Sequence, residues 1–302
     1  MDLGGARIAV TGATGFLGRY VVDTLLRRGA HVIGVVRNPE RVPALAARGV
    51  ELRKADLLAP AALARGLAGA DAVVSNAALF ALRNQRWEEH HRTNVAGTEN
   101  VFRALAEAGV RRVVHVSSVA VYARRRERRI REDHPQLHEG SRRTLTNTYP
   151  ISKAVSEQRA WRLAAEHGLA LTTVRPCGIY GAFDPNFTPI FRRLVGFPVT
   201  VLPAFMRIPF VYAGDVAEAI ALALERPVAV GKAYNVTGDD RTFYDLARAW
   251  RHVGGKAALL ALPLPLPISR LYDNGLAERD LGWRNRPFVE GLGETLALER
   301  AR

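Results

Sequence analysis

A glycine-rich stretch near the N-terminus, Arg7 to Gly18 (RIAVTGATGFLG), constrains the fold more than any other part of the chain. Its apolar run, Ile8 to Val10, stops at Thr11, glycines follow at positions 12, 15 and 18, and a helical pattern begins at Arg19. Glycine at a strand-turn-helix junction accepts a positive φ and lets the backbone approach a diphosphate. The stretch therefore predicts a dinucleotide-binding turn whose first helical amides face the anion, with a purely structural turn as the alternative.

Apolar runs and helical patterns alternate through the first part of the chain. The further expected strands are His31 to Val36, Val50 to Lys54, Ala72 to Ser75, Arg112 to Ser117 and Leu169 to Arg175. The expected helices are Tyr20 to Arg28, Trp87 to Ala108 and Pro150 to His167. Because parallel strands need crossover helices, this alternation predicts an α/β fold, a Rossmann-type doubly wound parallel sheet covered on both faces. We expect ligands to bind beyond the carboxyl ends of its strands.

The alternation changes after Cys177, where a stretch rich in proline, phenylalanine and glycine begins. We expect Pro209 to Leu224 and Lys232 to Val236 to return to the main sheet as strand, helix and strand. The sequence thus predicts a dinucleotide-binding domain of residues 1–176 plus 209–236 and a smaller substrate lobe of residues 177–208 plus 237–302. The apolar tract Ala257 to Ile268, which contains three prolines, is expected to be an extended edge segment, with shallow membrane contact as the alternative.

The net charge of +14 is compatible with nucleic acid, an anionic membrane surface or acidic substrates. The arginines are scattered along helical patterns without interleaved aromatic residues, which favours a solvated basic surface and argues against a nucleic-acid partner. The single cysteine, Cys177, excludes an intrachain disulfide and a cysteine-built metal site. We expect no metal, no signal peptide, no membrane span and a reducing, cytoplasmic location.

The tip of the second strand bears on the choice of cofactor. A carboxylate there would accept a hydrogen bond from a free ribose 2′-hydroxyl, but the chain places Arg37 at this point. Since a guanidinium pairs with a 2′-phosphate, Arg37 predicts NADP(H), with NAD(H) as the alternative. Asp56, at the end of the third strand, is placed to accept a hydrogen bond from the adenine amino group; capping of the next helix is the other interpretation.

Ser118, Tyr149 and Lys153 form the most informative set of polar residues. Tyr149 and Lys153 are four residues apart and share one face of a helix, and Ser118 follows another strand. An ammonium beside a phenol, together with an oxidised nicotinamide, stabilises the phenolate, so we expect the pKa of Tyr149 to fall toward the working range. Pro150 disfavours helical geometry at Tyr149, and the helix is therefore expected to begin at Pro150.

These residues resemble the extended short-chain dehydrogenase/reductase superfamily, the NAD-dependent epimerase/dehydratase family, nearest to its dihydroflavonol-reductase and 3β-hydroxysteroid-dehydrogenase members. The resembling motifs are TGATGFLG (11–18), DL (56–57), TNVAGTENV (93–101), SSVAVY (117–122), YPISK (149–153) and RPCGIYG (175–181). Asn76 departs from the family, in which many members carry histidine there.

The resemblance implies that Ser118, Tyr149 and Lys153 are catalytic, with Asn94 supporting the active-site helix or a water relay. The strand ends and the resemblance together give the expected cofactor-binding residues: Gly12, Thr14, Gly15, Phe16, Leu17, Gly18, Arg37, Asp56, Leu57, Asn76, Ala77, Ala78, Ser117, Tyr149, Lys153, Pro176, Gly178 and Ile179.

The expected function is an NADP(H)-dependent oxidoreductase that interconverts a secondary alcohol and a ketone, with Tyr149 as acid/base. The alternatives are a nucleotide-sugar epimerase or dehydratase with tightly bound NAD, and a non-catalytic cofactor-sensing regulator. The substrate is expected to be a small molecule. The basic stretch Arg124 to Arg131 is expected to be a solvated loop or, alternatively, to receive an anionic substrate. The resemblance further implies a homodimer.

Overall fold

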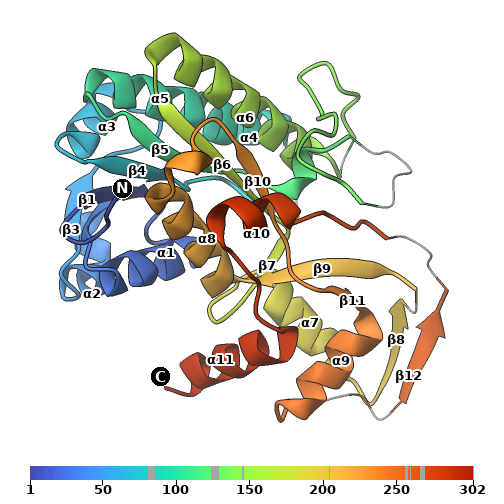
Figure 1. Ribbon diagram of the computed structural model, residues 1–302. Helices are drawn as coiled ribbons and strands as arrows, with labels where there is room; N and C mark the ends of the chain where they lie inside the picture. The colour runs from blue at the N-terminus through green and yellow to red at the C-terminus, as the bar shows by residue number, and fades with distance from the viewer. Residues whose placement is uncertain are drawn as a thin grey trace.

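A seven-stranded parallel sheet forms the centre of the protein, as the alternating apolar runs predict (Figure 1). In spatial order its strands are β10 (Ala233–Val236), β6 (Ala170–Pro176), β5 (Arg112–Val116), β4 (Ala72–Ser75), β1 (Arg7–Thr11), β2 (His31–Val36) and β3 (Glu51–Lys54). All six pairings are parallel. The computed structural model describes residues 1–80, 86–123, 129–144, 146–203, 205–255, 258, 260–265 and 269–301.

Helices cover both faces of this sheet (Figure 1). On one face α1 (Phe16–Arg27) packs against α8 (Ala213–Glu225), and on the other α3 (Pro60–Leu67), α5 (Gly97–Glu107) and α6 (Thr148–His167) pack in a row. Ile8 and Val10 of β1 belong to the core on the α1 side, whereas Ala9 between them belongs to the core on the α5 side. A strand buried on both faces reads as a continuous apolar run, which explains why these strands were visible in the sequence.

A smaller lobe lies at one end of the sheet (Figure 1). It contains a three-stranded sheet of β11 (Asp240–Thr242), β9 (Arg207–Tyr212) and β7 (Gly178–Tyr180), and a two-stranded sheet of β12 (Leu260–Leu264) and β8 (Val199–Pro203). Its helices are α7 (Phe187–Gly196), α9 (Phe243–His252), α10 (Gly275–Leu281) and α11 (Phe288–Arg300). The division of the chain into the two predicted lobes stays a prediction.

The strand expected at Pro209 does not return to the main sheet. It is β9, which pairs with β7 and β11, and only β10 joins the main sheet, where it pairs with β6. The edge of the main sheet beside β6 is thus taken by β10, and β9 pairs in the smaller lobe instead. Short helical segments complete the described chain: η1 (Pro39–Arg41), α2 (Pro43–Ala46), η3 (Val119–Val121) and η4 (Pro227–Ala229).

Two predicted helices have different boundaries from those expected. The helix predicted from Trp87 to Ala108 consists of α4 (Trp87–His90), a π-helical segment η2 (His91–Ala96) and α5. Helix α6 begins at Thr148 rather than at Pro150. Pro150 is then the third helical residue, within the first turn, where a backbone N–H has no intrahelical acceptor and proline costs little.

The proline tract is an extended edge segment in the part that the structure describes, since β12 pairs with β8 alone. None of the helices formed by the described residues is both long enough and apolar enough to cross a membrane.

Candidate functional site

The turn after β1 requires glycine at two of its positions for steric reasons. Gly12 has a φ of +70°, and a Cβ there would lie 2.9 Å from the Cα of Ala77. A Cβ at Gly18, in the first turn of α1, would overlap the carbonyl oxygen of Gly12. These two glycines let β1, α1 and the end of β4 come together, which is the close packing expected of a dinucleotide-binding turn.

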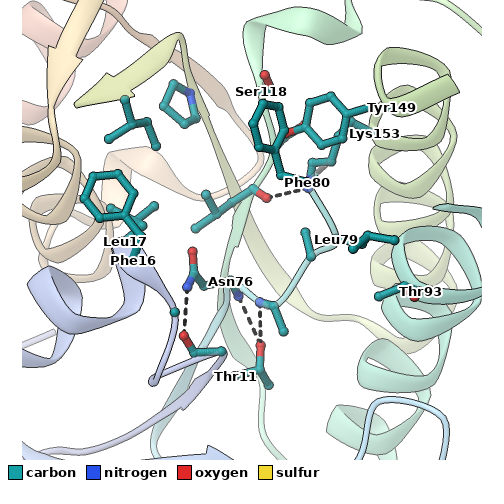
Figure 2. A pocket seen from close by; sticks show the side chains of 18 of the residues that line it. Thr11, Phe16, Leu17, Asn76, Leu79, Phe80, Thr93, Ser118, Tyr149 and Lys153 are labelled. Atoms are coloured by element: carbon teal, nitrogen blue, oxygen red, sulfur yellow. Dashed lines mark hydrogen bonds between the residues drawn. The ribbon is translucent and has the colours of Figure 1, made fainter. Parts of the chain in front are cut away.

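A cavity of about 1010 Å³ lies at the carboxyl ends of the parallel strands. It is lined by every predicted cofactor-binding residue except Gly18, which lies beneath the turn. Thr11, which was not among the predicted residues, fixes the floor of this cavity (Figure 2). Its Oγ1 accepts hydrogen bonds from the backbone N–H groups of Asn76 at 3.1 Å and Ala77 at 3.2 Å, and so ties the end of β4 to the glycine turn.

Ser118, Tyr149 and Lys153 gather at one end of the cavity (Figure 2). Ser118 caps η3 directly after β5, and its Oγ accepts a hydrogen bond from the N–H of Ala120 at 3.1 Å. Tyr149 and Lys153 come from successive turns of α6, and the Tyr149 hydroxyl is hydrogen-bonded to Ser118. The ring of Phe80 packs edge-on against Tyr149 with 4.9 Å between the centroids. The structure therefore brings the three predicted catalytic side chains together.

The electrostatics of this set differ from the expectation in one respect. Burial raises the pKa of Tyr149 to about 12, and the hydrogen bond with Ser118 only partly opposes this rise. Lys153 Nζ donates to the carbonyl oxygen of Val116 at 2.8 Å rather than to the phenol. The lowering of the Tyr149 pKa by Lys153 is therefore not seen. Burial also lowers the pKa of Lys153 to about 8, which the negative charge of Glu157 partly opposes.

Comparison with known proteins decides the family. Residues 8–237 match the family model described as "NAD dependent epimerase/dehydratase family". The chain belongs to this family.

Named relatives of this chain are mostly reductases and dehydrogenases. A 4-hydroxy-2-methyl-3-oxo-4-farnesyl-3,4-dihydroquinoline-1-oxide ketoreductase of Stigmatella aurantiaca is 37% identical over 61% of this chain and 53% of its own length, so the chain matches about half of that relative. A 3-beta-hydroxysteroid dehydrogenase of Mycolicibacterium neoaurum is 29% identical over 99% of this chain and 82% of its own length. The predicted family, and its 3β-hydroxysteroid-dehydrogenase-like branch, are confirmed.

The fold has a solved counterpart in UDP-N-acetylglucosamine 4-epimerase from Bacillus cereus, with a TM-score of 0.83 and 24% identity over 98% of this chain and all of the other. This likeness confirms the Rossmann-type fold. Taken with the family, it makes the chain an NAD(P)-dependent enzyme of the extended short-chain dehydrogenase/reductase type.

The candidate site is backed by a buried polar cluster that the sequence did not reveal. Glu157, one helical turn after Lys153, is fully buried and forms an ion pair with Arg175, whose Nη2 lies 2.5 Å from Glu157 Oε1. Arg175 Nη1 donates to the hydroxyl of Tyr122 at 2.7 Å, and that hydroxyl donates to Asn235 Oδ1 at 2.6 Å. The Arg175 guanidinium holds the pKa of Glu157 below its ordinary value, so a buried negative charge lies behind Lys153.

Asn94 lies outside the cavity lining, on the π-helical segment η2. Its Oδ1 accepts from the N–H of Leu79 at 2.7 Å, and its Nδ2 donates to the Leu79 carbonyl at 3.0 Å and to Ser152 Oγ at 3.0 Å. These contacts join the segment after β4 to α6. They match the supporting role predicted for Asn94, and its catalytic role stays a prediction.

Basic side chains surround a second pocket, of about 700 Å³, at the other end of the site. Arg37 follows β2 as predicted, and Arg41, Lys54 and Arg65 line the same pocket. Lys54 ends β3 and Arg65 lies on α3, so the fold brings them to Arg37 from distant positions in the sequence. Asp56 also lines this pocket, and its Oδ1 accepts a hydrogen bond from the N–H of Leu58 at 2.8 Å, in the turn before α3. This contact does not cap α3, whose N-cap is Ala59.

The basic stretch Arg124 to Arg131 is described only at its end, because residues 124–128 lie outside the described residues. Arg129 forms an ion pair with Asp240 at 3.4 Å, and Arg131 one with Asp133 at 3.3 Å. Both described arginines are thus paired with carboxylates.

Proposed function

We propose that this protein is an NADP(H)-dependent oxidoreductase that interconverts a secondary alcohol and a ketone. The observation that carries the proposal is the meeting of Ser118, Tyr149 and Lys153 in one cavity that also contains the glycine turn. An acid/base phenol is of use only where a hydride acceptor or donor lies within reach, and the glycine turn supplies a binding place for the dinucleotide at the same edge of the sheet.

The residues present fit a dinucleotide. Gly12, Thr14 and Gly15 of the turn line the cavity, so the turn is open to a diphosphate, and the cavity continues from this turn to Tyr149. The cofactor, when bound, supplies or accepts hydride at its nicotinamide ring. In the direction of reduction, Tyr149 donates its hydroxyl proton to the substrate oxygen, and Ser118 holds that oxygen by a hydrogen bond. Lys153, one helical turn from Tyr149, is the cation that would stabilise the phenolate left behind once the cofactor is bound.

The preference for NADP(H) over NAD(H) is supported by the second pocket. Four cationic side chains, Arg37, Arg41, Lys54 and Arg65, line it together with one carboxylate, Asp56. Such a group pairs with the dianionic 2′-phosphate of NADP(H), whereas the neutral 2′-hydroxyl of NAD(H) gives it little to bind.

The substrate end of the cavity supports an apolar substrate. Phe80, Phe187, Ile190 and Phe210 line it, and these side chains make no hydrogen bonds to a sugar or a phosphate. The named relatives fit this view, since one is a ketoreductase of a farnesylated quinoline oxide and the other a 3β-hydroxysteroid dehydrogenase. An apolar multi-carbon ketone or alcohol is therefore the substrate class that we propose, in place of the anionic substrate considered for the basic stretch.

Replacement of Tyr149 by phenylalanine tests the proposal. Tyr149→Phe removes the proton donor and keeps the ring that packs against Phe80, so kcat for reduction of an apolar ketone should fall by about 10²- to 10⁴-fold. NADPH affinity, measured by nucleotide fluorescence, should stay unchanged. Tyr180→Phe is the matched control because it removes a buried tyrosine hydroxyl outside the cavity lining. Full turnover by Tyr149→Phe, or binding of neither nucleotide by the native protein, would show that the proposal is wrong.

A nucleotide-sugar epimerase or dehydratase is the second candidate, favoured by the likeness of the fold to UDP-N-acetylglucosamine 4-epimerase. Such an enzyme retains its cofactor through turnover. Heat denaturation of the purified protein, followed by analysis of the released nucleotide, separates the two: stoichiometric NAD supports the epimerase, and exchangeable NADP(H) supports the reductase. We also propose a homodimer in the cytoplasm, which sedimentation and cell fractionation would test.

A further inference from the structure

An apolar face lies on the outside of the smaller lobe, where β8 and β12 pair in parallel. Val199 is opposite Leu260 and Val201 is opposite Leu262 in the register, so these side chains share one side of the two-stranded sheet. Val201 is 50% exposed and Leu262 is 45% exposed, and Leu264 continues the row. We call Val199, Val201, Leu260, Leu262 and Leu264 the β8–β12 apolar face.

The opposite side of the two strands explains why this face points outward. Thr200 and Leu202, which alternate with the exposed valines, are buried against the lobe. Helix α9 packs on that side, and the Tyr244 hydroxyl of α9 donates to the carbonyl oxygen of Ala261 at 3.1 Å. The lobe thus holds the inner side of the sheet and leaves the outer side without a partner among the described residues (Figure 1).

Neighbouring apolar side chains enlarge the exposed surface. Phe197 precedes β8 and Phe205 follows it, and both are exposed. Together with the β8–β12 apolar face they make up seven of the fifteen large exposed apolar side chains among the described residues. Exposed apolar residues that are scattered singly need no explanation, but such a concentration in one lobe indicates a binding surface.

The charge of the same chain segments identifies the partner. Residues 187–214 contain Arg192, Arg193 and Arg207 and no acidic residue. Residues 246–272 contain Arg248, Arg251, Lys256 and Arg270 and likewise no acidic residue. The two segments that build the apolar face therefore contain no acidic residue of their own. Arg192 is paired with Glu299 of α11, so the exposed cations of these segments are the remaining described arginines. An apolar surface with cationic side chains around it is the pattern of proteins that lie on an anionic bilayer.

We propose that the β8–β12 apolar face docks on the surface of a bilayer that contains anionic lipids. Its valines and leucines enter the boundary between headgroups and acyl chains, and the arginines of the two segments contact the headgroups. A second copy of the chain fits this face less well, because face-to-face pairing would place two acid-free cationic segments against each other and like charges repel.

The face adjoins the mouth of the cavity. Ser269 Oγ accepts a hydrogen bond from the N–H of Arg207 at 3.3 Å and donates one to the carbonyl oxygen of Phe205 at 3.4 Å. These two bonds hold Ser269 beside the end of the β8–β12 apolar face. Arg270, the next residue, and Ile190 both line the cavity. If the proposed function holds, an apolar substrate dissolved in the bilayer reaches Tyr149 through this mouth. Docking of the face on the bilayer does not depend on the proposed function.

Flotation of the purified protein with lipid vesicles tests the proposal. At low salt the protein should float with vesicles of equimolar phosphatidylglycerol and phosphatidylcholine and not with phosphatidylcholine alone, and high salt should weaken the binding. The double variant Val201→Asp/Leu262→Asp should lower the bound fraction at least about tenfold. Val228→Asp/Val230→Asp, at positions 47% and 42% exposed beyond the end of α8, is the matched control and should float like the native protein.

The outcomes that would overturn the proposal are distinct. Failure of the native protein to float with anionic vesicles, or unchanged flotation of a Val201→Asp/Leu262→Asp variant whose circular dichroism and melting temperature are native, would each do so. So would a dimer in solution that this variant dissociates, because the face would then belong to a second copy. Flotation needs neither cofactor nor turnover, so its result is independent of the Tyr149→Phe test.

Discussion

Single charged residues at the ends of strands carry the proposed preference of this site for NADP(H). Arg37 could be found from the sequence because it directly follows the apolar run of β2, and strand ends meet at the ligand edge of a parallel sheet. The same rule applies to Lys54 at the end of the predicted strand Val50 to Lys54, although Lys54 was not among the predicted residues. Arg65 could not be found in this way, because it reaches the pocket from α3. Its position there depends on how α3 packs after the crossover, which residue spacing does not give.

Loss of one cation from the basic pocket should weaken the binding of the 2′-phosphate of NADPH. Arg37→Ala and Lys54→Ala each remove a cation from the basic pocket, so the KM for NADPH should rise about 10- to 100-fold, the loss of one charge-assisted hydrogen bond. The KM for NADH should change little, since its 2′-hydroxyl is neutral. Steady-state kinetics with both nucleotides measure this. Arg48→Ala, an exposed arginine paired with Asp23, is the control. An equal loss with NADH would contradict the assignment of the pocket to the phosphate.

Whole elements were predictable where their burial left a clear pattern. Most strands of the main sheet are buried on both faces and appear in the sequence as apolar runs, whereas the edge strand β3 is polar and only partly buried. Six of the seven strands were predicted as strands, and the seventh, β10, as part of the return of the chain to that sheet. The π-helical segment η2 was not predictable, because the apolar spacing of a helix with one extra residue in a turn differs little from an α-helix. The sequence also does not indicate which strand a short strand pairs with, as the pairing of β9 with β7 shows.

The π-helical segment η2 should contribute to stability through the hydrogen bonds of Asn94. Asn94→Ala removes three hydrogen bonds that tie η2 to Leu79 and to α6, and it takes a partner from the half-buried backbone groups of Leu79 and from the buried hydroxyl of Ser152. We expect the free energy of unfolding to fall by about 2–3 kcal/mol and kcat/KM to fall as well. Urea denaturation and kinetics measure both. Asn100→Ala, which removes a single hydrogen bond to Leu57, should cost only about 1 kcal/mol. Equal costs would show that Asn94 does not join these elements.

The molecule as a whole keeps an unusual set of charges inside its core. Lys153, Glu157 and Arg175 are all buried, and they connect α6 with β6 behind the cavity. The sequence indicated Lys153 through its spacing from Tyr149, but nothing in the sequence paired Glu157 of the helix with Arg175 of the strand. Only the tertiary packing makes them a buried pair, so their influence on Lys153 could not be foreseen.

The free energy of unfolding of the whole protein should depend on pH because Lys153 is buried. Burial lowers its pKa to about 8, whereas an unfolded lysine titrates near about 10.4, so between these values the unfolded chain binds more protons than the folded one. The contribution of Lys153 to the free energy of unfolding must therefore rise with pH in this window.

Urea denaturation of the native protein and of Lys153→Met measures this contribution. Relative to Lys153→Met, the free energy of unfolding of the native protein should rise by about 2 kcal/mol between about pH 8 and about pH 10. Below about pH 7 the difference between the two proteins should be constant, because Lys153 is then charged in both states. A difference that stays constant up to about pH 10 would mean that Lys153 is solvated in the folded protein, and the buried ammonium on which the proposed site depends would be absent.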